Sequence, residues 1–252
     1  DIAEMIIGIV TAAPKLADII SNYPVLADNL LYRSFWRPEE DWAKQEEELV
    51  GLVNASDDYE ERLLILRRTC REWQFRTSAQ LLQEQISPTR AGRDYTKIAD
   101  IMIRVGLTIA QDNIARRFGT VDDSGITVLA MGRLGAEEMT LLSDLDLIFV
   151  YDGENTTHSS GDEGVKALPI NQYYARLGQE LINVLSAQTA EGKCYDINMR
   201  LRPSGNKGPV SVHLETFFNY QRDEAWTWEH MALIKSRVIG HIGARNPSDV
   251  LA

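Results

Sequence analysis

The sequence has 252 residues, 44% of them hydrophobic and 25% charged, which is enough apolar material to bury a core without disulfide or metal staples. Its net charge of −11 argues against DNA or RNA as the main partner, because nucleic acids bind basic surfaces that release counterions. With no run of about 18 apolar residues, no basic-apolar leader and two widely separated cysteines, it lacks the marks of membrane, secreted and disulfide-rich proteins, so we expect a cytoplasmic protein.

The N-terminal half carries apolar residues at the three- and four-residue spacing of amphipathic helices. We predict helices over residues 2–10, 15–20, 25–31, 39–53 and 59–85. A further helix follows, with Asp94 as its N-cap and Gly119 just beyond its end. Residues 1–118 are therefore expected to form a helical subdomain.

From residue 119 onward the pattern changes to alternating strands and helices. We predict buried strands over residues 126–131 and after Asp144, a helix from Pro169 to about Gly192, and a short strand over residues 194–200. Residues 119–213 are thus expected to form an α/β subdomain with a small mixed sheet, so the fold class is a helix-rich α+β one.

Residues 214–236 again have a helical pattern, and this stretch carries Trp226 and Trp228. We take residues 214–252 as a helical segment that begins a truncated C-terminal region. The chain starts at Asp1 instead of Met, and we therefore expect it to be a piece of a longer protein.

Two carboxylates, Asp144 and Asp146, stand one residue apart at the mouth of an apolar strand. Residues i and i+2 of a strand point to the same face, so both carboxylates can reach the same cations while Leu145 and Leu147 pack away from them. Hard oxygen ligands suit Mg²⁺. The spacing predicts a magnesium site.

A glycine turn precedes these carboxylates. Gly132 and Gly135 follow the strand at residues 126–131, and glycines let backbone amides approach an anion closely. The helix that starts there would aim its N-terminus at a phosphate. A strand, a glycine turn, a short helix and a strand that opens with Asp-x-Asp together favour nucleotidyl transfer. No Gly-Lys-Ser/Thr follows, so the turn is not a P-loop.

Four motifs occur in one order along the chain. They are Gly132-Arg-Leu-Gly135, Ser143-Asp-Leu-Asp146, Met199-Arg-Leu-Arg-Pro-Ser-Gly205 and Glu224-Ala-Trp-Thr-Trp-Glu-His230. Together they resemble the glutamine synthetase adenylyltransferase family, which belongs to the DNA polymerase β-like nucleotidyltransferases. Members carry two similar halves, one that removes AMP from glutamine synthetase by phosphorolysis and one that adds it. The residues of the last two motifs are similar to those of the AMP-adding half.

The resemblance implies roles for particular residues. Asp144 and Asp146 would hold two Mg²⁺ ions, and Gly132 and Ser143 would line the phosphates of ATP, the substrate. Arg133 and Gly135 belong to the same turn and are further candidates for nucleotide binding, although Arg133 could equally be a surface residue at a helix start.

Arg200 and Arg202 would share a face with residue 198 if that strand continues, which would place two guanidiniums near the triphosphate. The alternative for both is surface salt bridging with the many acidic residues. Lys235 and Arg237 are weaker candidates for the same contact.

One residue departs from the family pattern. The family has Asp two residues before the first Arg of Arg-Leu-Arg-Pro, and this chain has Asn198. An amide is nearly isosteric with the acid but neutral, so it would keep the fold while weakening the metal that activates the attacking hydroxyl. Asp196 lies on the same strand face, about 6.6 Å along the strand, and would substitute only partly.

These expectations lead to one main hypothesis and two rivals. The main one is transfer of AMP from ATP to a tyrosine hydroxyl of glutamine synthetase, with release of pyrophosphate. The rivals are phosphorolytic removal of AMP, and a domain that binds nucleotide or its protein partner without turnover because of Asn198. The resemblance further implies regulation by the PII signalling protein and glutamine in bacterial nitrogen metabolism, with neither nucleic acid nor membrane as a partner.

Two other groups of residues receive structural interpretations. Trp226, Trp228 and His230 invite a stacking or catalytic role, but aromatic residues at helical spacing more often pack against the core. The basic run of Arg67, Arg68 and Arg71 is interpreted as a solvated helix face.

Overall fold

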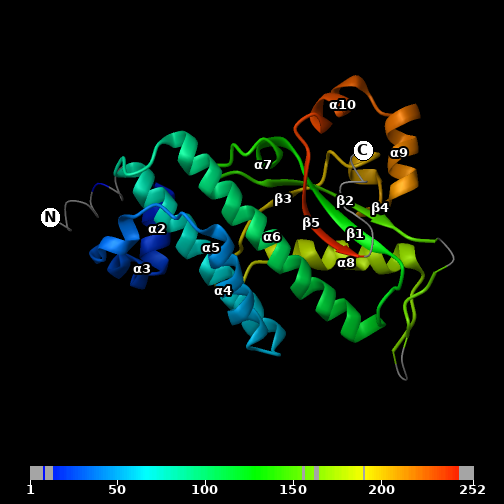
Figure 1. The fold of residues 1–252 in the computed structure, drawn as a ribbon, viewed down its shortest axis with the longest axis horizontal. Coiled ribbons are helices and arrows are strands. Elements are labelled where there is room, and N and C mark those ends of the chain that lie inside the picture. The colour runs from blue at the N-terminus through cyan, green and yellow to red at the C-terminus, as the bar shows by residue number, and fades with distance from the viewer. Residues whose placement is uncertain (1–7, 9–13, 155–156, 162–164, 190, 244–252) are drawn as a thin grey trace.

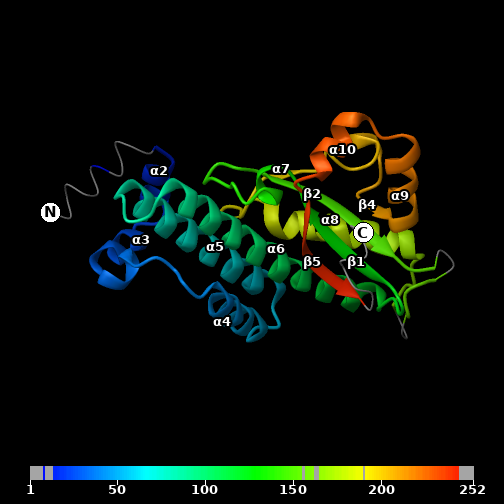
Figure 2. The same ribbon diagram turned by 45° about the horizontal axis from the view of Figure 1, so that its top comes forward.

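The computed structural model describes residues 8, 14–154, 157–161, 165–189 and 191–243. The helix expected over residues 2–10 lies outside these ranges, apart from Gly8. In Figures 1 and 2 the long helices α5 (Tyr59–Leu82) and α6 (Pro88–Phe118) lie side by side and lead from a group of short helices to a small sheet. The helix-rich α+β class is confirmed. No helix in the described ranges combines the length and hydropathy that a membrane span requires.

The short N-terminal helices build a small core on α5. They are α2 (Pro14–Asn22), α3 (Val25–Asp28), η1 (Asn29–Leu31) and η2 (Arg33–Trp36). Leu16, Leu30 and Phe35 are buried there against Phe75 of α5. Helix α4 (Trp42–Asn54) follows, capped by Asp41, whose side chain accepts a hydrogen bond from the Lys44 N–H.

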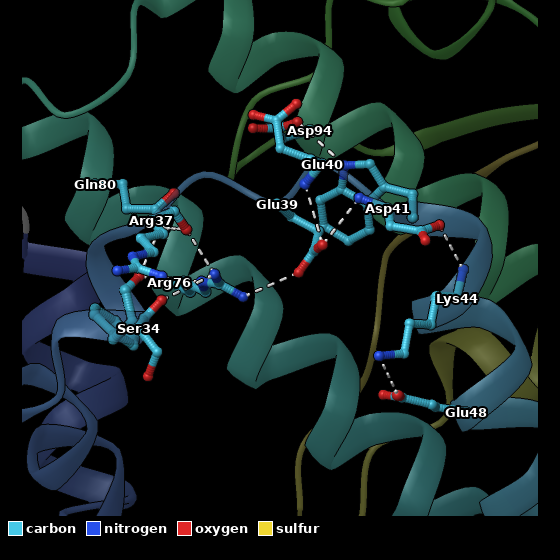
Figure 3. A network of polar contacts seen from close by, with 12 residues as sticks. Ser34, Arg37, Glu39, Glu40, Asp41, Lys44, Glu48, Arg76, Gln80 and Asp94 are labelled. Carbon is cyan, nitrogen blue, oxygen red and sulfur yellow. Dashed lines mark hydrogen bonds and ion pairs between the residues drawn. The ribbon is translucent and has the colours of Figure 1, made fainter.

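Helix α6 begins earlier than the sequence indicated, and the expected N-cap at Asp94 is wrong. Ser87 caps the helix by accepting from the Arg90 N–H, and Pro88 takes the first helical position, where its missing N–H costs nothing. Asp94 lies within the helix and accepts from Arg90 and from the Trp42 indole N–H (3.3 Å), next to the polar network of Figure 3. The predicted end is confirmed, since Gly119 follows the last helical residue at φ 76°.

Within the described ranges the sheet has five strands and is mixed. Antiparallel β1 (Gly125–Ala130) pairs with β2 (Leu145–Asp152) on one side and with β5 (Arg237–Gly243) on the other. The other edge of β2 pairs in parallel with β3 (Ile197–Asn198) at its start and with β4 (Ser211–His213) at its end. The start of β2 is therefore flanked by β1 and β3.

Helices cover both faces of this sheet. Leu145, Leu147 and Phe149 of β2 belong to the large core that includes α6 and α8 (Ile170–Ser186). The alternate residues Ile148 and Val150 belong to a smaller core under α9 (Leu214–Asp223) and α10 (Thr227–Leu233). Because side chains alternate along a strand, Asp146 lies on the α9–α10 face, and Leu145 packs away from it as expected.

Several predicted elements have different bounds in the structure, and residues 214–252, expected to form a helical segment, also contribute strand β5 to the sheet. Helix α8 ends at Ser186, and a turn with reciprocal Thr189 and Gly192 backbone hydrogen bonds follows it. The strand predicted over residues 194–200 is reduced to β3. The helix predicted over residues 214–236 is broken into α9 and α10, because Glu229 accepts from the Trp226 N–H and starts a new helix there.

The contact between α8 and the sheet predicts a stability effect at Gly178. A Cβ atom there would lie 2.5 Å from Ser211 Oγ and 2.9 Å from Phe149, whereas a Cβ on Gly51 of α4 would meet nothing within 4 Å. We expect Gly178→Ala to lower the free energy of unfolding by about 1–3 kcal/mol through overpacking. Gly51→Ala should raise it by about 0.5–1 kcal/mol through helix propensity. Urea unfolding of both variants checks the pair, and equal effects would contradict it.

Candidate nucleotidyl-transfer site

Asp144 and Asp146 lie at the start of β2. Asp144 is exposed immediately before the strand, and Asp146 is partly buried within it. Burial raises the pKa of Asp146 and the charge of Asp144 raises it further, against smaller opposing effects of Arg200, Asn198 and Arg133. The two carboxylates therefore repel each other, and a cation bound between them would relieve that repulsion.

Asn198 lies directly beside Asp146 in the parallel pairing of β3 with β2. Its side chain lowers the pKa of Asp146, which favours the charged carboxylate. The Asn198 Oδ1 atom accepts a hydrogen bond from the Arg200 N–H at 3.1 Å. The amide NH₂ is the part of this side chain that can donate to a carboxylate.

The glycine turn approaches the same carboxylate from β1. Gly132 has φ 55°, and a Cβ atom on it would lie 2.4 Å from Asp146 Oδ2, so no side chain fits at this position. The Asp146 carbonyl accepts from the Met131 N–H at 2.9 Å. Helix α7 (Gly132–Gly135) is a single turn, so few of its amides and little helix dipole are available to an anion.

The other residues of the turn have separate surroundings. Arg133 is exposed, and its charge reaches Asp146. Gly135 packs against the segment just before β5, where a Cβ atom would lie 2.1 Å from the Lys235 carbonyl oxygen. Ser143 is buried, and its Oγ accepts from the Thr140 N–H at 3.0 Å, which closes a turn just before Asp144.

The expectation that Arg200 and Arg202 share a strand face with Asn198 is wrong, because β3 ends at Asn198 and the chain turns. Arg200 is exposed, and its charge lowers the pKa of Asp146. Arg202 is buried, and its guanidinium donates to the carbonyl oxygens of Met199 (2.9 Å) and Gly208 (3.3 Å). Arg202 therefore holds this loop together, and it forms no salt bridge with any residue that the structure describes.

The weaker cationic candidates are engaged in pairs. Lys235 Nζ lies 3.9 Å from Glu138, and the Arg237 guanidinium binds both carboxylate oxygens of Asp100. Asp196 is exposed and pairs with Lys193. No sequence pattern pointed to Asp100, which is buried in the middle of an apolar helix.

The structure contradicts the interpretations given above to the tryptophan segment and to the basic run on α5. The packing expected for the tryptophans is wrong, since Trp226 is 72% exposed and Trp228 is 54% exposed, and His230 is exposed as well. In the basic run only Arg68 is solvated. Arg67 is buried and donates to the Val184 carbonyl oxygen.

Arg71 does not lie on a solvated helix face either. It binds Glu191 and stacks on the Tyr23 ring at 3.3 Å. Arg67 and Arg71 are one helical turn apart, so both face the segment after α8. Cys70 and Cys194 are free thiols, as expected.

The residues at the start of β2 fit one Mg²⁺ ion better than two. Among the described residues, no cluster of three or more histidine, cysteine or acidic side chains is placed to hold a metal. Mg²⁺ is commonly held by one or two carboxylates together with substrate phosphates, and Asp144 and Asp146 meet that requirement. Asn198 is a weaker third ligand than a carboxylate because its amide is neutral.

Comparison with known proteins supports the same assignment. A model of the glutamate-ammonia ligase adenylyltransferase family matches residues 3–248. The chain is 43% identical over 236 residues to the bifunctional glutamine synthetase adenylyltransferase/adenylyl-removing enzyme of Brucella suis biovar 1, covering 94% of this chain and 24% of the relative. For proteins of the same name, identity is 41% over 237 residues in Mesorhizobium japonicum (94% and 24% covered) and 39% over 239 residues in Xanthobacter autotrophicus (95% and 24%).

These relatives are much longer than the chain, which spans about a quarter of their length. The matched region nevertheless includes the glycine turn, both carboxylates and Asn198. The chain belongs to the glutamate-ammonia ligase adenylyltransferase family.

Proposed function

We propose that this chain is a catalytic unit that transfers AMP from ATP to a tyrosine hydroxyl of glutamine synthetase and releases pyrophosphate. The observation that carries the proposal is the convergence of Asp144, Asp146 and the Gly132 turn at one end of β2. The names of the relatives refer to the same protein substrate. We place the reaction in the cytoplasm.

Each residue has a role that follows from its surroundings. Asp144 and Asp146 would hold Mg²⁺, which when bound offsets negative charge on the attacking and leaving oxygens. Gly132 leaves room for the Asp146 carboxylate and for the phosphates beside it. Arg200 and Arg133 are exposed cations close enough to influence Asp146, and both are available to the triphosphate. Positioning and electrostatics supply most of the catalysis in this kind of transfer.

Asn198 favours the rival in which the domain binds nucleotide without turnover. Its neutral amide occupies the position of the third carboxylate of the family, beside Asp146, so it supplies no negative charge for a second ion. The other rival, phosphorolytic removal, is kept because the relatives are named for both reactions. Regulation by the PII signalling protein and by glutamine is part of the proposal for the whole protein.

Restoring the acid tests both direction and turnover. We expect Asn198→Asp to raise AMP transfer from labelled ATP to glutamine synthetase by about 10²-fold, because a third carboxylate adds metal-held charge stabilisation. The measurement is incorporation of label into the target tyrosine with Mg²⁺ present. A parallel assay with adenylylated glutamine synthetase and phosphate measures release of ADP.

The outcomes separate the three hypotheses. Labelling by the Asp variant well above that by the original chain supports AMP addition. Phosphate-dependent release of ADP without labelling of the tyrosine contradicts AMP addition and supports AMP removal. ATP binding without either activity in both proteins leaves only the binding function.

A further inference from the structure

Arg237 occupies an unusual position between three elements that are far apart in sequence. It is the first residue of β5 and pairs in register with Ala130, the last residue of β1 before the glycine turn. Its side chain reaches Asp100 in the middle of α6 and the Leu134 carbonyl oxygen in α7. Arg237 therefore connects the turn beside Asp146 to the longest helix of the described chain.

The contacts use the full planar geometry of the guanidinium. Nη1 donates to Asp100 Oδ2 at 2.9 Å, and Nη2 donates to Oδ1 at 2.6 Å. Nη2 and Nε donate to the Leu134 carbonyl oxygen at 3.0 and 3.3 Å. The Asp100 side chain is 3% exposed, so the pair is shielded from solvent and its geometry is restrained. A lysine ammonium cannot reproduce two parallel bonds and a third to a carbonyl.

The backbone segments next to the Arg237–Asp100 pair also pack closely against each other. Gly135 lies so near the Lys235 carbonyl oxygen that a Cβ atom would approach to 2.1 Å. The turn from Gly132 to Gly135 is thus held on one side by Asp146 and on the other by the start of β5. With a single helical turn, α7 has few internal hydrogen bonds of its own to keep its shape.

We propose that Arg237, fixed by Asp100, is a positioning residue that holds the glycine turn in the geometry needed to receive the nucleotide phosphates. This inference rests on the proposed function, because it assigns the turn to the phosphates of ATP. Arg237 does not itself contact the triphosphate, since its donors are directed at Asp100 and Leu134. The helical region acts on the site through this pair.

The chain offers a matched control on the same helix. Arg104 of α6 binds Glu46 through two bonds of 2.6 Å and also contacts β5, at the Ile239 carbonyl oxygen (3.5 Å). Arg104→Lys therefore disturbs a bidentate pair on the same helix and strand without touching α7. Comparison with Arg237→Lys separates a general loss of packing from an effect on the turn.

The experiment measures hydrogen exchange and ATP binding in the full chain. We expect Arg237→Lys to speed amide exchange at Gly135 and Ala136 at least about tenfold and to raise the Kd for Mg·ATP by about tenfold, as supporting-residue changes commonly do. Asp100→Asn should act in the same direction. Arg104→Lys should leave both values within about twofold.

The possible results are distinguishable. Unchanged exchange at Gly135 and Ala136 in Arg237→Lys and Asp100→Asn overturns the positioning role, as does an equal change in Arg104→Lys. If Arg237→Lys exchanges faster but the original chain does not bind Mg·ATP, the positioning role of Arg237 stands and the proposed function fails. If Arg237→Lys does not fold, Asp100→Asn supplies the same comparison.

Discussion

Asp146→Asn, introduced into the Asn198→Asp variant, is expected to reduce AMP transfer by about 10³-fold or more. The neutral amide removes half of the carboxylate pair that would hold Mg²⁺, and loss of metal-held charge stabilisation is worth several kcal/mol in the transition state. The Asn198→Asp background is used because we expect it to provide a higher reference rate. The measurement is the initial rate of tyrosine labelling at saturating ATP, with the Kd for Mg²⁺ determined in parallel.

The control for this change is Asp196→Asn. Asp196 is an exposed carboxylate on the segment that leads to β3, and its side chain pairs only with Lys193 in the described contacts. Loss of a negative charge at this position should change the rate by less than about twofold, since exposed pairs contribute little. If the Asp146→Asn enzyme keeps more than about a tenth of the rate, Asp146 is not a ligand of a catalytic metal ion.

Gly132→Ala is expected to lower the same rate by about 10²-fold while the protein remains folded. Alanine at φ 55° costs about 1–2 kcal/mol in backbone strain, and its methyl group would lie 2.4 Å from Asp146 Oδ2. The carboxylate must then move, and a displacement of about 1 Å at a catalytic group can cost about 10²-fold in rate. The rate and the free energy of unfolding are measured together.

Gly192→Ala separates strain from displacement. Gly192 has φ 77°, but a Cβ atom there would meet nothing closer than the Tyr23 hydroxyl at 3.8 Å. The free energy of unfolding of this variant should fall by a similar amount, about 1–2 kcal/mol, while its activity is retained. If both variants lose activity equally, the close approach of Gly132 to Asp146 is not the cause.

Local patterns predicted the elements that carry the site. The alternation of apolar residues after Asp144 correctly indicated β2, and the glycines at 132 and 135 correctly indicated a turn between two strands. Both signals are local, because side-chain direction in a strand and the positive φ of a turn depend on neighbouring residues. The α+β class followed from the same periodicities.

Polar side chains were predicted less well, because their partners depend on how the chain turns and packs. The sequence pattern predicts Asp94 as a helix cap, whereas in the structure it lies within α6 and accepts from Arg90 and from Trp42, 52 residues away. The pattern predicts Arg202 as a strand residue aimed at phosphates, whereas the short strand and the loop after it turn the guanidinium toward the Met199 carbonyl oxygen. Trp226 and Trp228 were expected to be buried, and the break between α9 and α10 leaves them exposed.

By itself the sequence determined the order of strand, glycine turn and Asp-x-Asp, and the amide in place of an acid at position 198. Only the tertiary structure decided that Asn198 lies beside Asp146 and that Arg237 binds Asp100, 137 residues away. Periodicity reports which face a side chain points to, whereas a hydrogen-bond partner depends on which distant segment packs against that face.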